Sequence, residues 1–251
     1  MAKFKSWRSY RDFKRAVREQ MRYIRTPEME SFLDAVRQTA KKRVNVLHPG
    51  FSLWRAQLGC DWQTEQEEGE AWSMETPWPY GKDRMMPLRD RATEGRANPK
   101  GIPLLYLATH RNTAIAEVRP WIGSYVSVGR FKTRRELRIV DCTGTITMIY
   151  GNSEPSPAER EQNVWGYINE SYASPVTRAD NVADYAPTQI IAELLKAHGY
   201  DGIVYRSSVS ERGQNVALFD LEAAELVQGH VFEVTHVSFK SSQAAGPVNY
   251  R

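Results

Sequence analysis

The chain has 251 residues, of which 41% are hydrophobic and 25% charged, values that are ordinary for a soluble globular protein with a sizeable core. No stretch approaches the roughly 20 apolar residues that cross a bilayer, and the basic N-terminus lacks the apolar core of a secretory signal. The two cysteines, Cys60 and Cys142, form no partner motif, which argues against a disulfide framework or a zinc site. A reducing cytoplasm is therefore the expected compartment.

The formal net charge is +4, and much of the positive excess lies in the first 25 residues. The cations there are Lys3, Lys5, Arg8, Arg11, Lys14, Arg15, Arg18, Arg22 and Arg25. Such a run attracts phosphate groups or an acidic partner. Charge alone does not specify a ligand, so a solvated helix face is favoured, and direct nucleic-acid binding is not expected.

Apolar residues at intervals of three and four predict a helix over residues 4–25, packed in the core or against another subunit. A second helix is expected from Thr26, a capping residue before Pro27, to the cluster at 41–43. Residues 51–56 read as a short strand. A polar loop with Trp62, Trp72 and Trp78 then covers residues 59–96, and loops of this length are functional or partly disordered.

The second half of the chain alternates between apparent strands and helices. A strand at 102–108 precedes a helix at 112–121, and strands follow at 125–131 and 137–141. An acidic, helix-like stretch and an aromatic-bearing loop occupy 151–187. A helix from 188 ends before Gly199, residues 200–220 read as strand, turn and strand, and 241–251 as a tail. This mixture predicts the α+β class.

Several common chemistries have no motif here. A Walker loop, a GxGxxG fingerprint, HExxH and a cysteine–histidine ligand set are all missing. The five histidines are dispersed, so a metal centre or a Ser-His triad is not favoured, and His110 is expected to cap or line a loop.

Three polar clusters beside apolar segments remain as candidates. The first is a turn with Arg96 and Asn98, whose guanidinium suits phosphate oxygens. The second is Glu117, an acid among small apolar residues, preceded by Tyr106 on the strand. The third is the turn "YRSSVSERGQN" at 205–215. Each also has an ordinary structural interpretation: a surface charge, an ion pair of Glu117 with Arg55 or Arg119, or plain turn chemistry.

Together these clusters resemble the RES family, named for an arginine, a glutamate and a serine. The stretch "GRANPKGIPLLYLATHRNTAIAEV" carries the family's arginine turn, strand tyrosine and helix glutamate at Arg96, Tyr106 and Glu117. The pair Trp54-Arg55 resembles the start of the domain, and "DGIVYRSSVSERGQNVALF" resembles its serine block. Within that block Ser207 is the preferred family serine and Ser208 the alternative.

The resemblance covers about residues 46–236 and divides the chain into a helical N-terminal extension, 1–45, and a RES-type catalytic domain, 46–251. It implies an ADP-ribosyltransferase-like mixed or antiparallel β core flanked by helices. Ala97 stands where the family commonly has an aromatic residue, which is expected to alter the pocket wall.

The resemblance also implies an enzyme that consumes NAD+ as a substrate, by cleaving the nicotinamide–ribose bond, and needs no cofactor or metal. Glu117, Arg96 and Ser207 are the expected catalytic residues. The expected substrate-binding residues are Arg55, Tyr106, Asn98, Ser208 and Asn215.

The resemblance further implies that the protein is a bacterial cytoplasmic toxin with a cognate Xre-like antitoxin, and that a homodimer is a possible assembly. Whether water or phosphate accepts the ribosyl group stays open. The alternatives are an ADP-ribosyltransferase that modifies a macromolecule, and a non-catalytic protein that binds nucleic acid or a partner.

Overall fold

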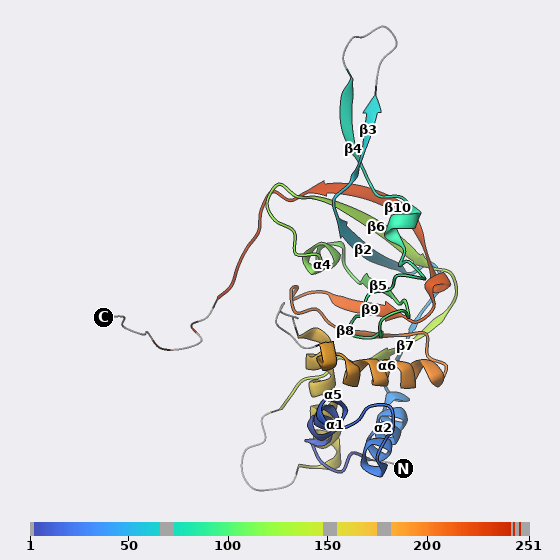
Figure 1. The fold of residues 1–251 in the computed structure, drawn as a ribbon, viewed down its shortest axis with the longest axis vertical. Helices are drawn as coiled ribbons and strands as arrows, with labels where there is room; N and C mark the ends of the chain where they lie inside the picture. Colours follow the sequence, from blue (N-terminus) through green and yellow to red (C-terminus); the bar gives the residue numbers. More distant parts are fainter. Residues whose placement is uncertain are drawn as a thin grey trace.

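A computed structural model describes residues 3–65, 73–147, 155–174, 182–241, 243 and 246. Trp72 and most of the expected tail lie outside these residues. An eight-stranded sheet runs through the middle of the molecule, with helices gathered mainly at one end (Figure 1). The α+β class with a mixed, largely antiparallel sheet is confirmed.

The strands of the large sheet lie in the order β1-β7-β8-β9-β5-β2-β6-β10. In chain order they are β1 (Val44–Leu47), β2 (Ser52–Leu58), β5 (Leu105–Ala108), β6 (Tyr125–Thr133), β7 (Leu137–Asp141), β8 (Gly202–Arg206), β9 (Gln214–Leu218) and β10 (Ala224–Glu233). Among these pairs β7 and β8 run parallel and the others antiparallel. The short strands β5 and β9 lie side by side at the centre with Ala108 opposite Asn215, which brings the second and third polar clusters together.

The expectation of one continuous loop over residues 59–96 is wrong, because this range contains two strands and a short helix. Strands β3 (Asp61–Glu65) and β4 (Met74–Trp78) form an antiparallel hairpin that projects from the body (Figure 1), and α3 (Lys82–Met85) follows. The hairpin buries little apolar surface, and Trp62 and Trp78 are about half exposed. A strand that packs against no core needs no apolar alternation, so its sequence carries no strong period-two signal.

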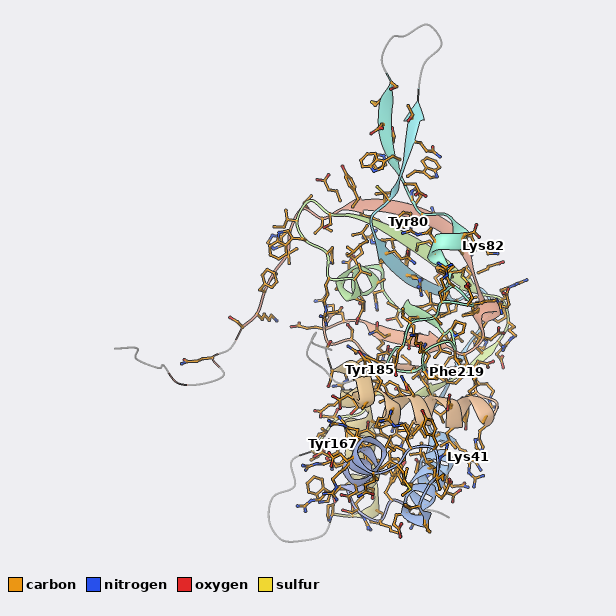
Figure 2. All side chains as sticks on the ribbon, in the orientation of Figure 1. Lys41, Tyr80, Lys82, Tyr167, Tyr185 and Phe219 are labelled. Carbon is orange, nitrogen blue, oxygen red and sulfur yellow. The ribbon has the colours of Figure 1, made fainter. Side chains whose placement is uncertain are left out.

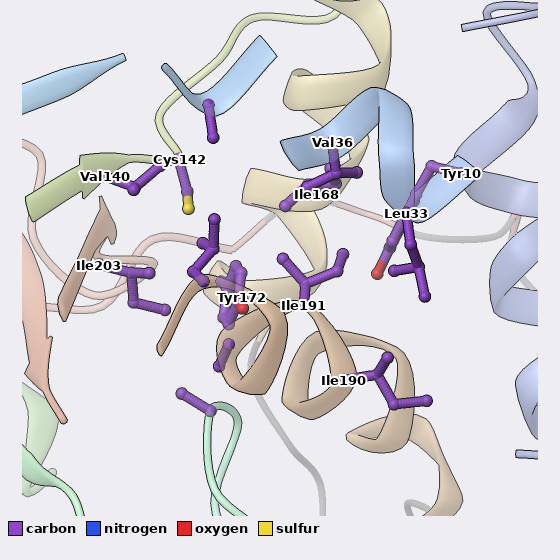
Figure 3. Packing of buried hydrophobic residues seen from close by; sticks show 14 of the residues in the cluster. Tyr10, Leu33, Val36, Val140, Cys142, Ile168, Tyr172, Ile190, Ile191 and Ile203 are labelled. Carbon is purple, nitrogen blue, oxygen red and sulfur yellow. The ribbon is translucent and has the colours of Figure 1, made fainter. Parts of the chain in front are cut away.

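Four helices form a layer at one end of the sheet: α1 (Ser9–Glu19), α2 (Pro27–Ala40), α5 (Pro157–Ala173) and α6 (Ala186–Ala197). Figure 3 shows their apolar side chains meeting those of the sheet, with Tyr172 and Ile191 in the middle. Phe13 of α1 stacks on Phe32 of α2, with ring centroids 4.5 Å apart. The N-terminal helices therefore share one apolar core with the two later helices.

Both N-terminal helices form, but the first is shorter than expected. Thr26 caps α2 by accepting a hydrogen bond from the Met29 amide. Helix α1 begins at Ser9, whose hydroxyl bonds the backbone of Ser6 and favours a turn there. It ends at Glu19, so the apolar residues of the following loop do not reach the core, and Ile24 is 77% exposed.

Helix α4 (Arg111–Glu117) packs on β2, β5 and β6 and also ends earlier than expected. Arg119 has a left-handed backbone with φ of 48°, and Pro120 supplies no amide to continue the helix. Glu117 is consequently the last helical residue, and its side chain lies where the chain turns away from the sheet.

Candidate active site

A cavity of about 360 Å³ lies where α4, the sheet centre and the Arg96 turn meet. Figure 2 labels Tyr185, one of its wall residues, at the junction between the sheet and the helical layer. The lining residues are Trp54, Arg55, Ala56, Gly95, Arg96, Tyr106, Leu107, Ala108, Ala114, Glu117, Val118, Tyr185, Tyr205 and Asn215. Residues far apart in sequence thus converge on one hollow.

The carboxylate of Glu117 is fixed by two side chains from the β8–β9 region. Ser207 Oγ donates to Glu117 Oε1 over 2.7 Å, and Asn215 Nδ2 donates to the same oxygen over 2.6 Å. Oε2 receives no side-chain hydrogen bond within the described residues. An ion pair of Glu117 with Arg55 or Arg119, the structural alternative, does not occur in this part of the chain. Glu117 is half-buried, and neutral donors fix the orientation of its carboxylate.

The structure separates the two candidate serines. Ser207 follows β8 directly, and its hydroxyl also accepts a hydrogen bond from the Val209 amide at 3.2 Å. Ser208 is exposed and lines a different hollow. Of the two, Ser207 is therefore the serine that contacts the acid.

Gly213 lets the β8–β9 turn approach α4. A Cβ atom at this position would lie 1.8 Å from Thr113 Oγ1 on α4, far inside van der Waals contact. Asn215, two residues later, pairs with both Ala108 of β5 and Tyr205 of β8. The motif Gly-x-Asn thus serves close packing at its first residue and the Glu117 contact at its third.

Arg55 is a half-buried cation whose hydrogen-bonding capacity is not filled. Its Nη1 donates to the Tyr106 carbonyl at 3.2 Å, while the buried Nε has no partner in the described residues. Burial lowers the pKa of Arg55 below its usual value. An anion in the cavity would supply the missing acceptor.

The turn that carries Arg96 is held rigidly. The Asn98 side-chain amide donates to the carbonyls of Thr93, Pro99 and Ile102, at 3.0, 3.1 and 2.8 Å. Gln189 of α6 donates to the Asn98 carbonyl at 2.9 Å. Arg96 itself donates through Nη1 to the Tyr172 carbonyl. These contacts direct the guanidinium along the cavity wall.

Tyr106 joins the central strand to this turn. Its hydroxyl donates to Asn98 Oδ1 at 2.7 Å and accepts from the Ala97 amide at 3.0 Å. Burial raises the pKa of the Tyr106 hydroxyl well above its usual value. A Cβ on Gly95 would come within 2.7 Å of that hydroxyl, which explains the glycine before Arg96.

The structure places two residues of this turn away from the cavity wall. Asn98 is absent from the cavity wall and is occupied with building the turn. Ala97 is 2% exposed and belongs to the apolar core of the helical layer, so its small side chain does not shape the cavity. The side-chain amide of Asn98 and the methyl group of Ala97 point into the fold, because the turn wraps around the Tyr106 hydroxyl.

Sequence reasoning did not assign two tyrosines to the site. Tyr185 precedes α6, and Tyr205, on β8, stacks on Tyr172 with centroids 5.3 Å apart. Burial is the main cause that raises the pKa of Tyr205, and Tyr106 raises it further. The charge of Arg96 lowers this pKa, and that of Glu117 raises it. Tyr205 follows the apolar run Gly202, Ile203 and Val204 and reads as core; its place at the start of the serine block was the signal available in the sequence.

A larger hollow of about 1020 Å³ adjoins the first: Trp54 lines both, and Ser207, which bonds Glu117 of the first cavity, lines the larger one. Arg111, Arg212 and Lys240 bring positive charge to it, and Lys240 pairs with Glu211. His110 lines it too, and its ring contacts the Thr109 hydroxyl at 3.0 Å rather than capping α4. The two hollows together extend across the face that carries Glu117.

The described residues hold neither a cluster of metal ligands nor a helix suited to span a membrane. They contain no group of three or more His, Cys, Asp or Glu side chains arranged to hold a metal ion. None of the described helices combines the length and the apolar character that a membrane span requires.

Comparison with known proteins places these residues in a family. The crystal structure of the M. tuberculosis MbcT–MbcA toxin–antitoxin complex is similar, with 15% identity and a TM-score of 0.43, covering 79% of this chain and 92% of that one. No curated protein matches the chain. The model of the RES domain matches residues 52–241, a span that holds Arg96, Tyr106, Glu117 and Ser207. Since that match covers well over half of the sequence, the chain belongs to the RES domain family.

Proposed function

We propose that this RES-domain protein consumes NAD+ by breaking the bond between nicotinamide and ribose, and that it is the toxin of a toxin–antitoxin pair. The observation that carries the enzymatic proposal is the setting of Glu117. Its carboxylate lies in the wall of a 360 Å³ cavity and is oriented through one oxygen by Ser207 and Asn215. Arg55 and Arg96 line the same cavity.

Glu117 suits the charge that develops during this cleavage. As the bond breaks, its electron pair leaves with nicotinamide, which becomes neutral, and the ribose carbon and ring oxygen share a positive charge. A fixed carboxylate stabilises that charge most in the transition state, which lowers the barrier. Water then yields ADP-ribose and a proton, whereas phosphate yields ADP-ribose phosphorylated at the same carbon. Ser207 and Asn215 act as positioning residues by holding Oε1.

The two arginines suit the phosphates of the substrate. Arg96 would hold the pyrophosphate, and Arg55 would hold another phosphate oxygen or an attacking phosphate. The unpartnered Nε of Arg55 supports this role, because a phosphate oxygen would complete its hydrogen bonding. Tyr106, Tyr185 and Tyr205 would line the space for the nicotinamide riboside.

A whole dinucleotide needs more room than the smaller cavity. Ligand sites commonly measure about 300–1,000 Å³, and the 360 Å³ cavity is at the low end of that range. The adjoining hollow of about 1020 Å³ shares Trp54 with it and is lined by Ser207, Arg111 and Arg212. We place the adenosine half there, with Ser208 at its edge.

Product analysis tests the reaction. Purified protein is incubated with NAD+ with and without inorganic phosphate, and nicotinamide, ADP-ribose and phosphorylated ADP-ribose are quantified. Glu117→Gln keeps the shape and the hydrogen-bonding oxygen but removes the charge, so turnover is expected to fall by at least about 100-fold. Glu193→Gln, on the exposed face of α6, is the matched control. Near-normal turnover of a folded Glu117→Gln protein would remove Glu117 from the mechanism.

The toxin assignment is tested separately in growing bacteria. Expression of the wild-type chain is expected to lower cellular NAD+ and stop growth. Expression of the Glu117→Gln chain is expected to leave both growth and the NAD+ level unchanged. Labelled NAD+ distinguishes the rival activity: label fixed to protein or nucleic acid indicates ADP-ribosyl transfer, and free ADP-ribose products indicate hydrolysis or phosphorolysis.

A further inference from the structure

The N-terminal segment has a charge opposite to that of the remaining chain. Residues 3–25 hold nine of the 34 Lys and Arg residues but two of the 30 Asp and Glu residues. This segment therefore carries a net charge of +7, while the rest of the chain, with 25 cations and 28 anions, carries −3. The basic character of the protein is thus concentrated on α1 and its flanks.

The cations of α1 form an ordered column. Arg8, Arg11, Arg15 and Arg18 are spaced by three and four residues, so they lie along one side of the helix about 5–6 Å apart. Tyr10, Phe13 and Val17 occupy the buried side. All four arginines are exposed. Arg15 lies 3.5 Å from Asp12, and Arg18 pairs with Asp184 at 2.7 Å.

This column borders a groove between α1 and α5. The groove measures about 690 Å³, and five cations line it: Arg8, Arg11, Lys14, Arg15 and Arg18. Three acids, Asp12, Glu19 and Glu170, line it as well, which leaves a net charge of +2. The hydroxyls of Ser171 and Ser174 come from α5. Within the described residues Arg8, Arg11 and Lys14 form no ion pair, so their charges remain available.

An aromatic pair stands beside the cations. Tyr167 of α5, labelled in Figure 2, lines the groove and stacks on Trp7, with centroids 6.2 Å apart and planes inclined by 26°. The guanidinium of Arg8 lies over the Trp7 ring, 4.8 Å from its centroid. Neither Trp7 nor Tyr167 is fully buried. Proteins that bind single-stranded nucleic acid combine a row of cations along the phosphate backbone with aromatic rings on which the bases stack. The arginines of α1 and the Trp7–Tyr167 pair form such an arrangement.

We propose that the α1–α5 groove binds single-stranded nucleic acid, with phosphates along the arginine column and a base against the Trp7–Tyr167 pair. A duplex would satisfy the cations but would keep its base faces stacked inside. An acidic protein would likewise satisfy the charges, but it would make no specific use of the aromatic pair. The rings beside the cations therefore favour an unpaired strand over both.

The test measures binding of full-length protein to a short labelled oligothymidylate, and to the matching RNA, by fluorescence anisotropy at increasing salt. Replacing Arg8, Arg11 and Lys14 together by Gln is expected to reduce the slope of log K against log salt by about 2, since each phosphate contact contributes about 0.7. The matched control replaces Lys82, Arg91 and Lys100 by Gln; these are exposed cations outside the basic segment, and Figure 2 labels Lys82 on α3. The control is expected to bind like the wild type.

A second pair of variants tests the stacking. Trp7→Ala is expected to weaken binding at least about fivefold, the lower end of one base–aromatic stack, and Trp7→Phe to retain most of it. Thermal unfolding and NAD+ consumption of every variant establish that the fold and the other site are intact. Equal losses in the control triple, an unchanged salt slope, no effect of Trp7→Ala, or displacement of the strand by polyglutamate as readily as by unlabelled oligonucleotide would each overturn the proposal.

Discussion

Removing the Ser207 hydroxyl should lower kcat without weakening the binding of substrate. Ser207 Oγ and Asn215 Nδ2 both donate to Glu117 Oε1, at 2.7 and 2.6 Å, so Ser207→Ala leaves one of two contacts that orient the carboxylate. A hydrogen bond to a charged group contributes about 1.5–3 kcal/mol. If that energy is expressed in the transition state, kcat falls by about 10- to 150-fold. KM should change little, because the carboxylate acts mainly on charge that appears as the bond breaks.

The measurement is a comparison of kcat and KM for nicotinamide release across the wild type and four variants. Ser208→Ala serves as the neighbour control: Ser208 makes no contact with Glu117, so kcat should stay close to the wild-type value, whatever happens to KM. Asn215→Ala and the double variant complete a cycle. Because both donors hold one oxygen, the combined loss should differ from the sum of the single losses. A Ser207→Ala protein with unchanged kcat, or additive effects throughout the cycle, would refute the positioning role.

Two further predictions concern stability. Gly213→Ala places a Cβ 1.8 Å from Thr113 Oγ1 and should lower the free energy of unfolding by about 1–3 kcal/mol, with about 2–4 °C lost in Tm per kcal/mol. The control is Gly81→Ala, whose Cβ would have no heavy atom within 4 Å. Equal Tm values for the two variants would contradict the packing argument. At high pH the chain should lose stability, because burial raises the pKa values of Tyr10, Tyr106, Tyr172 and Tyr205 above the usual value of 10.0. These tyrosines keep their protons in the folded state, while the unfolded chain releases them. The free energy of unfolding should therefore fall above about pH 10 by up to about 1.4 kcal/mol per pH unit and per tyrosine. The fall should be less steep in Tyr106→Phe. Urea unfolding across this range measures the slope, and a flat profile would count against the burial of these groups.

Local sequence patterns predicted the elements that bury one face. Thr26 before Pro27 marked the start of α2, Gly199 marked the end of α6, and the apolar run at 125–131 became β6. The same reasoning failed for the projecting β3–β4 hairpin and missed β10 altogether. The burial pattern of β10 is mixed, because it lies at the sheet edge beside β6, and an edge strand with partial burial shows weak periodicity.

The functional residues divide in the same way. The spaced motif around Arg96, Tyr106 and Glu117 identified the family from the sequence, because a glycine, an arginine and an acid at set distances reflect constraints on one turn and one helix end. Within that motif the sequence did not distinguish a residue that faces the cavity from one that builds its wall, as Asn98 shows.

The α+β class, the family and the candidate acid were predictable from the sequence, since they depend on local spacing and composition. The contact of Ser207 rather than Ser208 with Glu117, and the presence of Tyr185 and Tyr205 at the cavity, follow from the folded arrangement alone. Strand β9 lies between β5 and β8, so strands about 100 residues apart in the chain align their side chains through sheet register. Tyr185 is brought in differently, by α6, which packs on β8. Register is a property of paired strands, and a single strand's sequence does not carry it.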